Sequence, residues 1–381
     1  MKGFINQNVY VEGKGIIKTN LGFENGKIVY IGDDATGIEE ISLPEGAIIA
    51  PGFIDEHIHG ASGSDAMDGT VEYLETIALS VAGEGTTGFL ATTMTQSPAN
   101  ITKALNAVRD YANEKGAKVL GVHLEGPFIS LNHVGAQPKE YVANPSVEIF
   151  KTYEEASGGK IKIVSLAPEN EGSAELIKYL VSKGVVASVG HSDATYADID
   201  KAIENGLKNS THTYNCQKPL HHREIGTVGT VLLRDELNAE VIADCIHISV
   251  PAIKLLVKNK PHDKLTLITD AMRAKNLPDG ESELGGQKVF VKNGEARLEN
   301  GALAGSVLKM NVAIKNLVEK CDVPLTNAID FATINPATHL SISDKVGSIA
   351  VGKLADLVVL DKDFNVKLTI RDGNIVYNKK T

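Results

Sequence analysis

The sequence predicts an α/β protein: a (β/α)8 TIM-like barrel with a small β-sandwich-type domain built from both chain ends. Three observations lead to this fold class. Eight apolar, β-rich runs alternate with amphipathic segments through the middle of the chain. Short strand-like runs separated by glycine and asparagine occur at both ends. The length of 381 residues exceeds a usual single domain but suits one large barrel with an attachment.

The predicted barrel strands are spaced as a repeating βα unit requires. The eight runs are residues 47–60, 86–93, 118–126, 161–169, 185–193, 209–215, 239–247 and 265–271. Helical patterns lie between them, such as residues 173–181 with Gly184 as a stop signal, and residues 194–203. A doubly wound open sheet is the alternative. It is disfavoured because no glycine-rich phosphate loop with an acidic partner follows an early strand.

The two ends of the chain are predicted to form one small β domain. Asn25-Gly26 and Asp372-Gly373 are hairpin turn signals flanked by β-forming residues. Neither end has enough strands for a stable sheet of its own. We therefore predict that residues 1–49 and 355–381 pair into one domain, with the barrel of residues 50–354 inserted between them.

Two further elements are predicted after the eighth strand. An irregular insert covers about residues 276–303, and residues 288–294 within it indicate a hairpin. Residues 306–318 are expected to supply the final helix of the barrel.

The composition limits the partners and the compartment. A net charge of −10 disfavours nucleic acid and anionic membranes as partners, because both require a basic surface. No run approaches the roughly 18 apolar residues of a membrane span, and the first residues do not resemble a signal peptide. The three cysteines are scattered and odd in number, which is typical of a reduced, cytoplasmic protein.

Polar residues with metal-binding chemistry fall at the ends of the predicted strands. They are His57 and His59 on the first strand, Glu125 on the third, His191 on the fifth, His212 on the sixth and Asp270 on the eighth. Each alone has a structural explanation, as a helix cap or as a satisfied buried group. Barrel active sites lie at the carboxyl ends of the strands, so all six are expected to face one pocket. The pattern predicts a metal-dependent hydrolase.

The residue types assign provisional roles. Glu125, His191 and His212 can hold a divalent cation and leave one position open for water, whose pKa the metal lowers from about 15.7 to about 7. Asp270 is the natural general base. His57 and His59 would hold a second metal, with Glu125 bridging the two. Such ligands accept zinc, iron, manganese or cobalt.

The motifs that carry these residues extend over essentially the whole chain. They are residues 51–60, 123–128, 190–193, 211–215, 243–247, 269–271, 303–306 and 347–357. In these motifs the chain resembles the amidohydrolase superfamily and, within it, the N-acetylglucosamine-6-phosphate deacetylase family. The Glu-Gly-Pro-Phe sequence from Glu125, with no lysine at that strand end, is the most discriminating of them.

The resemblance implies hydrolysis of the acetamido group of N-acetylglucosamine 6-phosphate, with the metal ligands and the acid/base residue already named. It also implies that Arg223 reaches the phosphate from a neighbouring subunit, in a homodimer or tetramer, and arginine suits phosphate by its bidentate geometry. The implied substrate-binding residues are Ala136, Gln137, Asn215, Cys216, Arg223, His247, Leu303, Ala304, Gly305 and Ser306.

The chain departs from the family pattern at two positions. Gln137 stands where some members have histidine, and Cys216 stands where alanine is frequent. Both His57 and His59 are retained, so two metal ions are expected. The alternatives are an amidohydrolase for another N-acetylated amino sugar or cyclic amide, and a non-catalytic metal or sugar-phosphate sensor. The presence of Asp270 disfavours the sensor, which has no use for a general base.

Overall fold

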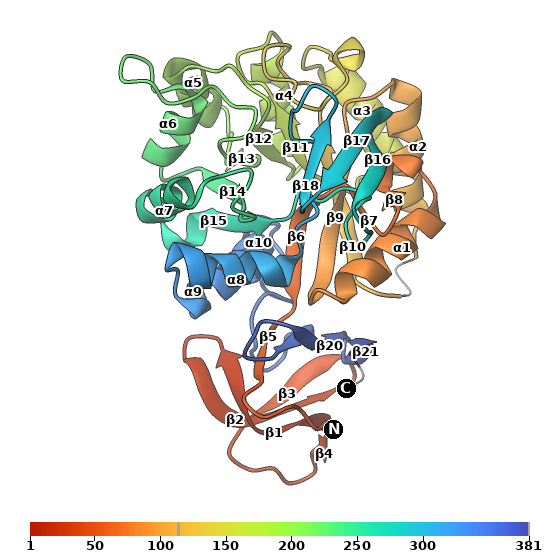
Figure 1. Cartoon of the computed structure of the whole chain (residues 1–381), viewed down its shortest axis with the longest axis vertical. Helices are drawn as coiled ribbons and strands as arrows, with labels where there is room; N and C mark the ends of the chain where they lie inside the picture. Colours follow the sequence, from red (N-terminus) through yellow and green to blue (C-terminus); the bar gives the residue numbers. More distant parts are fainter. Residues whose placement is uncertain (113–114, 380–381) are drawn as a thin grey trace.

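The computed structural model describes residues 1–112 and 115–379, and its largest element is a barrel of eight parallel strands (Figure 1). In hydrogen-bonded order these are β15 (Leu265–Ile268), β14 (Asn238–Ile242), β13 (Asn209–Ser210), β12 (Val186–Val189), β11 (Ile161–Leu166), β10 (Lys118–Glu125), β9 (Thr86–Thr92) and β6 (Phe53–Ile58). Each corresponds to one predicted run, in the predicted order. The predicted fold class is confirmed.

The first and last strands, β6 and β15, meet at a seam that nearly closes the barrel. Asp270 N donates to His57 O at 2.8 Å. Beneath this contact, the buried Asp55 carboxylate accepts from Thr269 Oγ1 at 2.5 Å and from Thr269 N at 3.2 Å. The seam is therefore held by a side chain of β6 as well as by backbone.

Helices surround the barrel. They are α1 (Val71–Ala82), α2 (Pro98–Asp110), α3 (Val147–Ala156), α4 (Ser173–Ser182), α5 (Tyr196–Glu204), α6 (Gly226–Leu233), α7 (Val250–Asn259), α8 (Met310–Cys321), α9 (Leu325–Ala332) and α10 (Ile334–His339), with 3-10 turns at Ala66–Asp68, Lys139–Tyr141 and His262–Lys264. No helix within the described residues is both long and apolar enough to cross a membrane.

Local signals explain where the predicted helices begin and end. Gly184 has φ +70° just after α4, as expected of a residue that terminates a helix. Thr195 and Asp198 form a capping box at the start of α5. The predicted final helix was wrong in two respects, because α8 begins only at Met310 and α9 and α10 follow it. Ser306 lies outside the helix because its backbone pairs with the segment after β15: its N–H donates to Asp270 O at 2.8 Å, and its carbonyl accepts from Met272 N at 2.9 Å.

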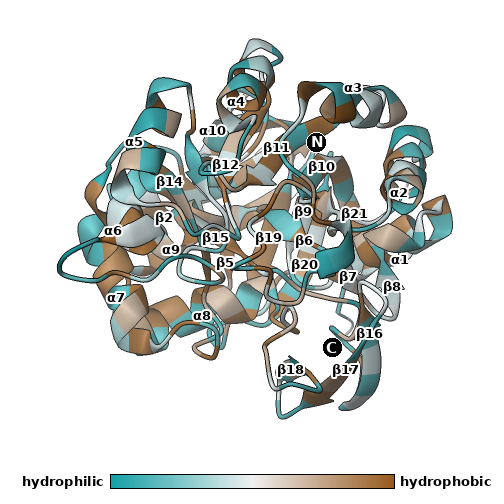
Figure 2. Ribbon diagram, turned by 90° about the horizontal axis from the view of Figure 1, so that it is seen from above, coloured by the Kyte–Doolittle hydropathy of each residue, from teal (hydrophilic) through white to brown (hydrophobic). Residues whose placement is uncertain are grey.

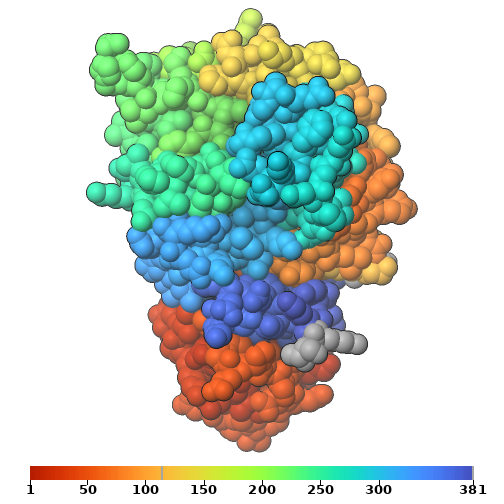
Figure 3. All heavy atoms as spheres, in the orientation of Figure 1, coloured from red at the N-terminus to blue at the C-terminus, as the bar shows by residue number. Residues whose placement is uncertain are grey.

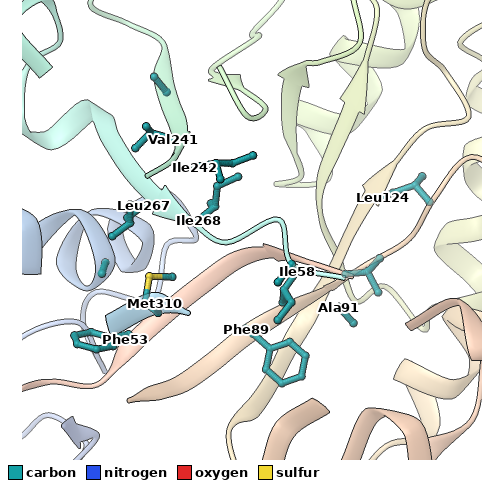
Figure 4. Packing of buried hydrophobic residues seen from close by; sticks show 14 of the residues in the cluster. Phe53, Ile58, Phe89, Ala91, Leu124, Val241, Ile242, Leu267, Ile268 and Met310 are labelled. Carbon is teal, nitrogen blue, oxygen red and sulfur yellow. The ribbon is translucent and has the colours of Figure 1, made fainter. Parts of the chain in front are cut away.

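The main core lies between the strands and the helices. All six residues of β6 and all seven of β9 are buried, as is typical of parallel strands covered on both faces. Figure 4 shows Phe53 and Ile58 of β6 and Phe89 of β9 in this core, with Met310 from α8. Seen from above in Figure 2, hydrophobic and hydrophilic residues alternate around the surrounding helices, as amphipathic helices require.

The strands at the two chain ends form a single eight-stranded sheet. Its order is β21 (Asn374–Asn378), β20 (Val366–Arg371), β19 (Leu357–Leu360), β5 (Ile48–Pro51), β1 (Lys2–Val11), β2 (Gly15–Glu24) and β3 (Lys27–Gly32), and β4 (Glu39–Glu40) pairs with β1. At the β2–β3 turn, Asn25 and Gly26 have φ +50° and +79°, the left-handed values of the predicted turn. The domain boundaries at residues 49 and 355 stay a prediction.

The small sheet lies below the barrel in Figures 1 and 3. Strand β5 leads into β6, so this sheet adjoins the amino ends of the barrel strands. The opposite end of the barrel, where the strands finish, is therefore left for a functional site.

An insert of three antiparallel strands follows the barrel. It contains β16 (Gly280–Leu284), β17 (Gln287–Lys292) and β18 (Glu295–Leu298), and the β17–β18 pair confirms the predicted hairpin. Its buried residues pack with Met94 and Met272 from the loops after β9 and β15. Figure 3 shows the insert, in cyan and blue, covering part of one face of the barrel. A short hairpin of β7 (Gly60–Ala61) and β8 (Ser64–Asp65) follows β6.

Candidate metal centre and active site

The predicted metal ligands converge at the carboxyl ends of the barrel strands. Glu125 lies at the centre, and its two carboxylate oxygens face different groups of histidines. The five ligands and Asp270 are buried, and they form two groups with metal-binding geometry: Glu125, His191 and His212; and His57, His59 and Asp270. The strand-end argument thus identified side chains that meet in space.

In the first group, three atoms lie at the spacing of a metal site. Glu125 Oε1 is 3.1 Å from His191 Nε2 and 2.9 Å from His212 Nε2, and the two nitrogens are 3.2 Å apart. Ligand atoms at 2.0–2.1 Å from a tetrahedral ion are about 3.3 Å from one another. The residues present therefore fit a divalent cation at this position.

In the second group, two imidazoles face two carboxylates. Asp270 Oδ1 is 3.5 Å from His57 Nε2 and 3.2 Å from His59 Nε2, while Glu125 Oε2 is 3.3 Å from His59 Nε2. Within the described residues, the buried His57 Nε2 has no hydrogen-bond partner. A buried nitrogen left over beside two carboxylates fits a second cation, with Glu125 between the two groups.

The far sides of the rings are held by fixed acceptors. His191 Nδ1 lies 2.8 Å from His133 O, and His59 Nδ1 lies 3.2 Å from Thr92 O. A carbonyl can only accept, so each Nδ1 is the donor and each Nε2 is the nitrogen that faces the centre of the group. Such contacts orient metal-binding histidines and fix their tautomer.

The backbone at the site adopts conformations that side chains disfavour. His191, His212 and Asp270 have φ values of +48°, +30° and +47°. A residue other than glycine in this region costs of order 1–3 kcal/mol, and such residues gather at functional sites. Each of them lies two residues after a barrel strand, β12, β13 or β15, where the turn directs the side chain toward the centre.

The charges in the site hold both carboxylates in their ionised form. Burial would raise the pKa of Glu125, but the surrounding imidazoles, His57 first, lower it well below its usual value. Burial likewise opposes ionisation of Asp270, but His57 and His59 outweigh burial and lower its pKa to about 2. Asp270 is therefore able to accept a proton at neutral pH.

Gln137 contacts a predicted metal ligand directly. Its Nε2 donates to Glu125 Oε2 at 2.8 Å, and its Oε1 accepts from Thr95 N at 2.7 Å, so the orientation of the amide is fixed. The side chain is buried. The structure thus gives Gln137 a role in holding Glu125, whereas the family resemblance implied only contact with substrate.

Most other predicted substrate-binding residues lie close to the two groups. Ser306 N donates to Asp270 O at 2.8 Å, which places the segment 303–306 beside the candidate base. Asn215 N donates to His212 O at 2.9 Å, and Cys216 O accepts from Ser192 N at 3.0 Å, next to His191.

The remaining three predicted residues lie on loops around the barrel mouth. Ala136 O accepts from Gln287 Nε2 of the insert, and His247 Nδ1 lies 2.6 Å from Asp244 Oδ2. Arg223 is separate from all of these. It is exposed on the loop between β13 and α6, which extends outward beyond α5 in Figure 1, and its Nη1 lies 2.7 Å from His222 Nε2. Among the described residues, the Arg223 guanidinium contacts His222 and none of the predicted metal ligands.

Sequence reasoning did not single out the buried acids behind the metal ligands. Glu240 Oε2 lies 3.1 Å from His57 Nδ1, and Glu56 Oε2 lies 2.9 Å from His339 Nδ1. A lone glutamate within the apolar run 239–247 was the available signal, because a charge in a buried strand requires a partner.

A model of the amidohydrolase family matches residues 48–376. The chain belongs to this family. The amidohydrolase is 43% identical over 380 residues to the N-acetylglucosamine-6-phosphate deacetylase of Bacillus subtilis (strain 168), covering 98% of this chain and 96% of that protein. It is 36% identical over 322 residues to the N-acetylgalactosamine-6-phosphate deacetylase of Escherichia coli O157:H7, covering 84% and 85%.

A solved structure also matches this amidohydrolase from end to end. The crystal structure of N-acetylglucosamine-6-phosphate deacetylase from Pasteurella multocida superposes with a TM-score of 0.93 at 32% identity. The match covers 99% of this chain and 100% of that one. The barrel and the terminal sheet are thus both parts of a known architecture.

Proposed function

We propose that this amidohydrolase hydrolyses N-acetylglucosamine 6-phosphate to glucosamine 6-phosphate and acetate. The observation that carries the proposal is the site itself: Glu125, His191 and His212 at metal-ligand spacing, with an ionised Asp270 beside them. The 43% identity to a deacetylase of this specificity, over nearly the full length of both chains, supports the substrate.

The proposed cofactor is a divalent metal, two ions per subunit, of zinc, iron, manganese or cobalt. Glu125, His191 and His212 would hold the first ion, and His57 and His59 the second, with Glu125 shared. A bound divalent cation supplies a water of lowered pKa and polarises the amide carbonyl.

The protein's own residues then move the proton. Asp270 accepts a proton from the attacking water as its oxygen adds to the acetamido carbon. The same carboxyl returns this proton to the sugar nitrogen when the carbon–nitrogen bond breaks. The water oxygen ends on acetate, and the amine leaves with its bonding pair and one new hydrogen.

The remaining predicted residues would position the substrate. His247, Asn215 and Cys216, with the segment 303–306 and the loop of Ala136 and Gln137, surround the two metal groups. Arg223 would bind the phosphate of a substrate held by a neighbouring subunit, so the active form is proposed to be a homodimer or tetramer. Its exposure on an outward loop agrees with this role. A cytoplasmic location is proposed from the three free thiols.

An assay of acetate release, run with metal analysis of the same preparation, tests the proposal. The expected result is rapid release from N-acetylglucosamine 6-phosphate and slow release from N-acetylglucosamine, with metal present in the active protein. Equal rates on both sugars would contradict the phosphate site. Full activity after complete removal of metal would contradict the metal-dependent chemistry.

A second candidate substrate is N-acetylgalactosamine 6-phosphate. The relative from Escherichia coli O157:H7 named for this substrate supports it, at 36% identity. The two sugars differ only in the configuration at C4, so the metal groups cannot discriminate between them. Ratios of kcat/KM for the two phosphates decide which substrate is preferred, and a higher ratio for the galactose form would replace the first proposal.

A further inference from the structure

A carboxylate that has no lysine or arginine partner among the described residues lies behind the two metal groups. Glu240 of β14 is completely buried, and its ion-pair partner among the described residues is His57. Its Oε2 accepts from His57 Nδ1 at 3.1 Å and from His212 N at 3.2 Å, and its Oε1 accepts from Asn209 Nδ2 at 2.8 Å. Two of these three donors belong to predicted metal ligands, one from each metal group.

A buried carboxylate destabilises the fold unless its oxygens are satisfied by donors. The donors to Glu240 include the ring of His57 and the backbone of His212. The burial of Glu240 is therefore coupled to the positions of these two predicted ligands. The contact with His212 is made by the backbone, at a residue whose φ of +30° needs support. The contact with His57 is made by its imidazole ring, and this contact determines which ring nitrogen of His57 carries the proton.

The hydrogen bond fixes which nitrogen of His57 faces the metal. An ionised Glu240 can only accept, so with this partner Nδ1 carries the proton and Nε2 keeps the lone pair. Nε2 points toward Asp270 Oδ1 at 3.5 Å and Glu125 Oε1 at 3.7 Å. This is the nitrogen that has no hydrogen-bond partner in the described part of the chain.

The same residues could instead be regarded as a third metal group, since His57, His123 and Glu240 lie within ligand distance of one another. The contacts of His123 oppose this. Its Nδ1 lies 3.0 Å from Glu56 O and its Nε2 lies 2.7 Å from Ser165 Oγ, so both nitrogens are already used. The ring of His123 instead packs against the ring of His57, and the two ring centroids are 4.5 Å apart.

We propose that Glu240 is a positioning residue that makes the His57 and His59 site competent for metal by fixing His57 in the Nδ1-protonated tautomer. This inference rests on the two-ion site of the proposed function. The two groups depend on Glu240 unequally. His212 Nε2 also contacts Glu125 and is held through its backbone, whereas His57 depends on Glu240 for the state of its ring.

The test is Glu240→Gln, measured by titration of metal-free protein with Zn²⁺ against a chelator, together with metal counts per chain. The amide keeps the shape, but its NH2 group can face Nδ1 and drive the His57 proton to Nε2. We expect the affinity for one ion to fall about 10–100-fold, as for other partners of metal-binding histidines, and the affinity for the other to stay within about threefold.

Glu56→Gln is the matched control. Glu56 is equally buried, adjacent to His57 in sequence, and its carboxylate contacts His339 and not a metal ligand. We expect this variant to lose thermal stability and to keep both metal affinities. If Glu56→Gln weakens one ion as strongly as Glu240→Gln does, the effect is general damage and the inference is overturned.

The outcomes separate this inference from the proposed function. A wild-type chain that binds only one ion overturns the two-ion site and the inference with it. A wild-type chain that binds two, with Glu240→Gln binding two equally well, overturns the role of Glu240 alone. Should Glu240→Gln fail to fold, ¹⁵N NMR of histidine-labelled wild-type protein without metal decides. A proton on His57 Nε2, assigned by comparison with His57→Asn, would overturn the inference.

Discussion

Replacing Asp270 with asparagine separates proton transfer from binding of the ion at Glu125, His191 and His212, because Asp270 is not a member of that group. The side chain keeps its size, but the amide cannot accept a proton from water. In the wild type the acceptor is fully ionised at neutral pH, because His57 and His59 outweigh burial and lower the pKa of Asp270 to about 2. The substitution therefore removes a base that is present in every molecule.

The size of the effect follows from that role. A positioned general base contributes about 10²–10⁴ in rate, which at about 1.36 kcal/mol per decade is roughly 3–5 kcal/mol of activation free energy. Asp270 touches the His57 and His59 group and makes no side-chain contact with His191 in the described structure. We therefore expect kcat to fall about 10²–10⁴-fold while the ion held by Glu125, His191 and His212 remains.

The assay is acetate release from N-acetylglucosamine 6-phosphate, with metal content measured on the same samples. Asp193→Asn is the control, because Asp193 lies on the loop after β12 and pairs with His133 and Lys218, outside both metal groups. Partly exposed pairs of this kind contribute less than about 1 kcal/mol. An Asp270→Asn enzyme within tenfold of wild type would refute the assignment of Asp270 as base.

Three further predictions address the ligand support, the phosphate and the fold. Gln137→Leu removes the hydrogen bond to Glu125 and leaves Thr95 N without its acceptor, so chelator competition should show metal affinity reduced about tenfold or more. Arg223→Ala should raise KM for the phosphorylated sugar and leave the unphosphorylated sugar unchanged; an unchanged KM would remove the phosphate role. Burial lowers the pKa of Lys260 from 10.5 to about 8, so between these pH values the unfolded chain holds a proton that the folded chain has lost. Relative to Lys260→Met, wild type should gain up to roughly 3 kcal/mol of unfolding free energy from pH 8 to 10.5 in urea titrations, and a constant difference would contradict this.

The fold could be predicted because its signals are local. Most barrel strands are short apolar runs with helical periodicity on either side, the polar β13 being the exception, and parallel strands buried on both faces produce that pattern. Turns such as Asn25-Gly26 specify their own backbone conformation. The candidate metal ligands followed from the fold, because residues at the ends of parallel strands share one edge whatever their separation in sequence. His57 and Asp270 meet for this reason.

The supporting residues could not be predicted in the same way. Gln137 comes from the loop after β10, and nothing in its neighbours indicates that its amide returns to Glu125. Glu240 lies in the middle of a strand, where its direction relative to His57 depends on the stagger of the barrel. The sequence from Ser306 onward has a helical pattern, but in the structure Ser306 lies outside α8 and its hydroxyl donates to Thr269 O. These positions are decided by tertiary contacts alone.

The seam of the barrel and the second metal group are one structural unit, which leads to a last prediction. Asp270 N donates to His57 O across the seam, and Asp55 beneath it holds Thr269. Weakening the β6–β15 contact should therefore also displace His57 and His59.

Stepwise removal of metal with a chelator should release the ion of the second group first. Glu125 lies at the end of β10, His191 follows β12 and His212 follows β13. Each of these strands is hydrogen-bonded to a neighbouring strand on both sides, and none of them forms the seam. Asp55→Asn should weaken the seam and increase the difference between the two release steps, since the amide supplies only one acceptor oxygen for the two Thr269 donors. Simultaneous release of both ions in wild type and in Asp55→Asn would show that the two groups act as one site, and that the seam does not govern either.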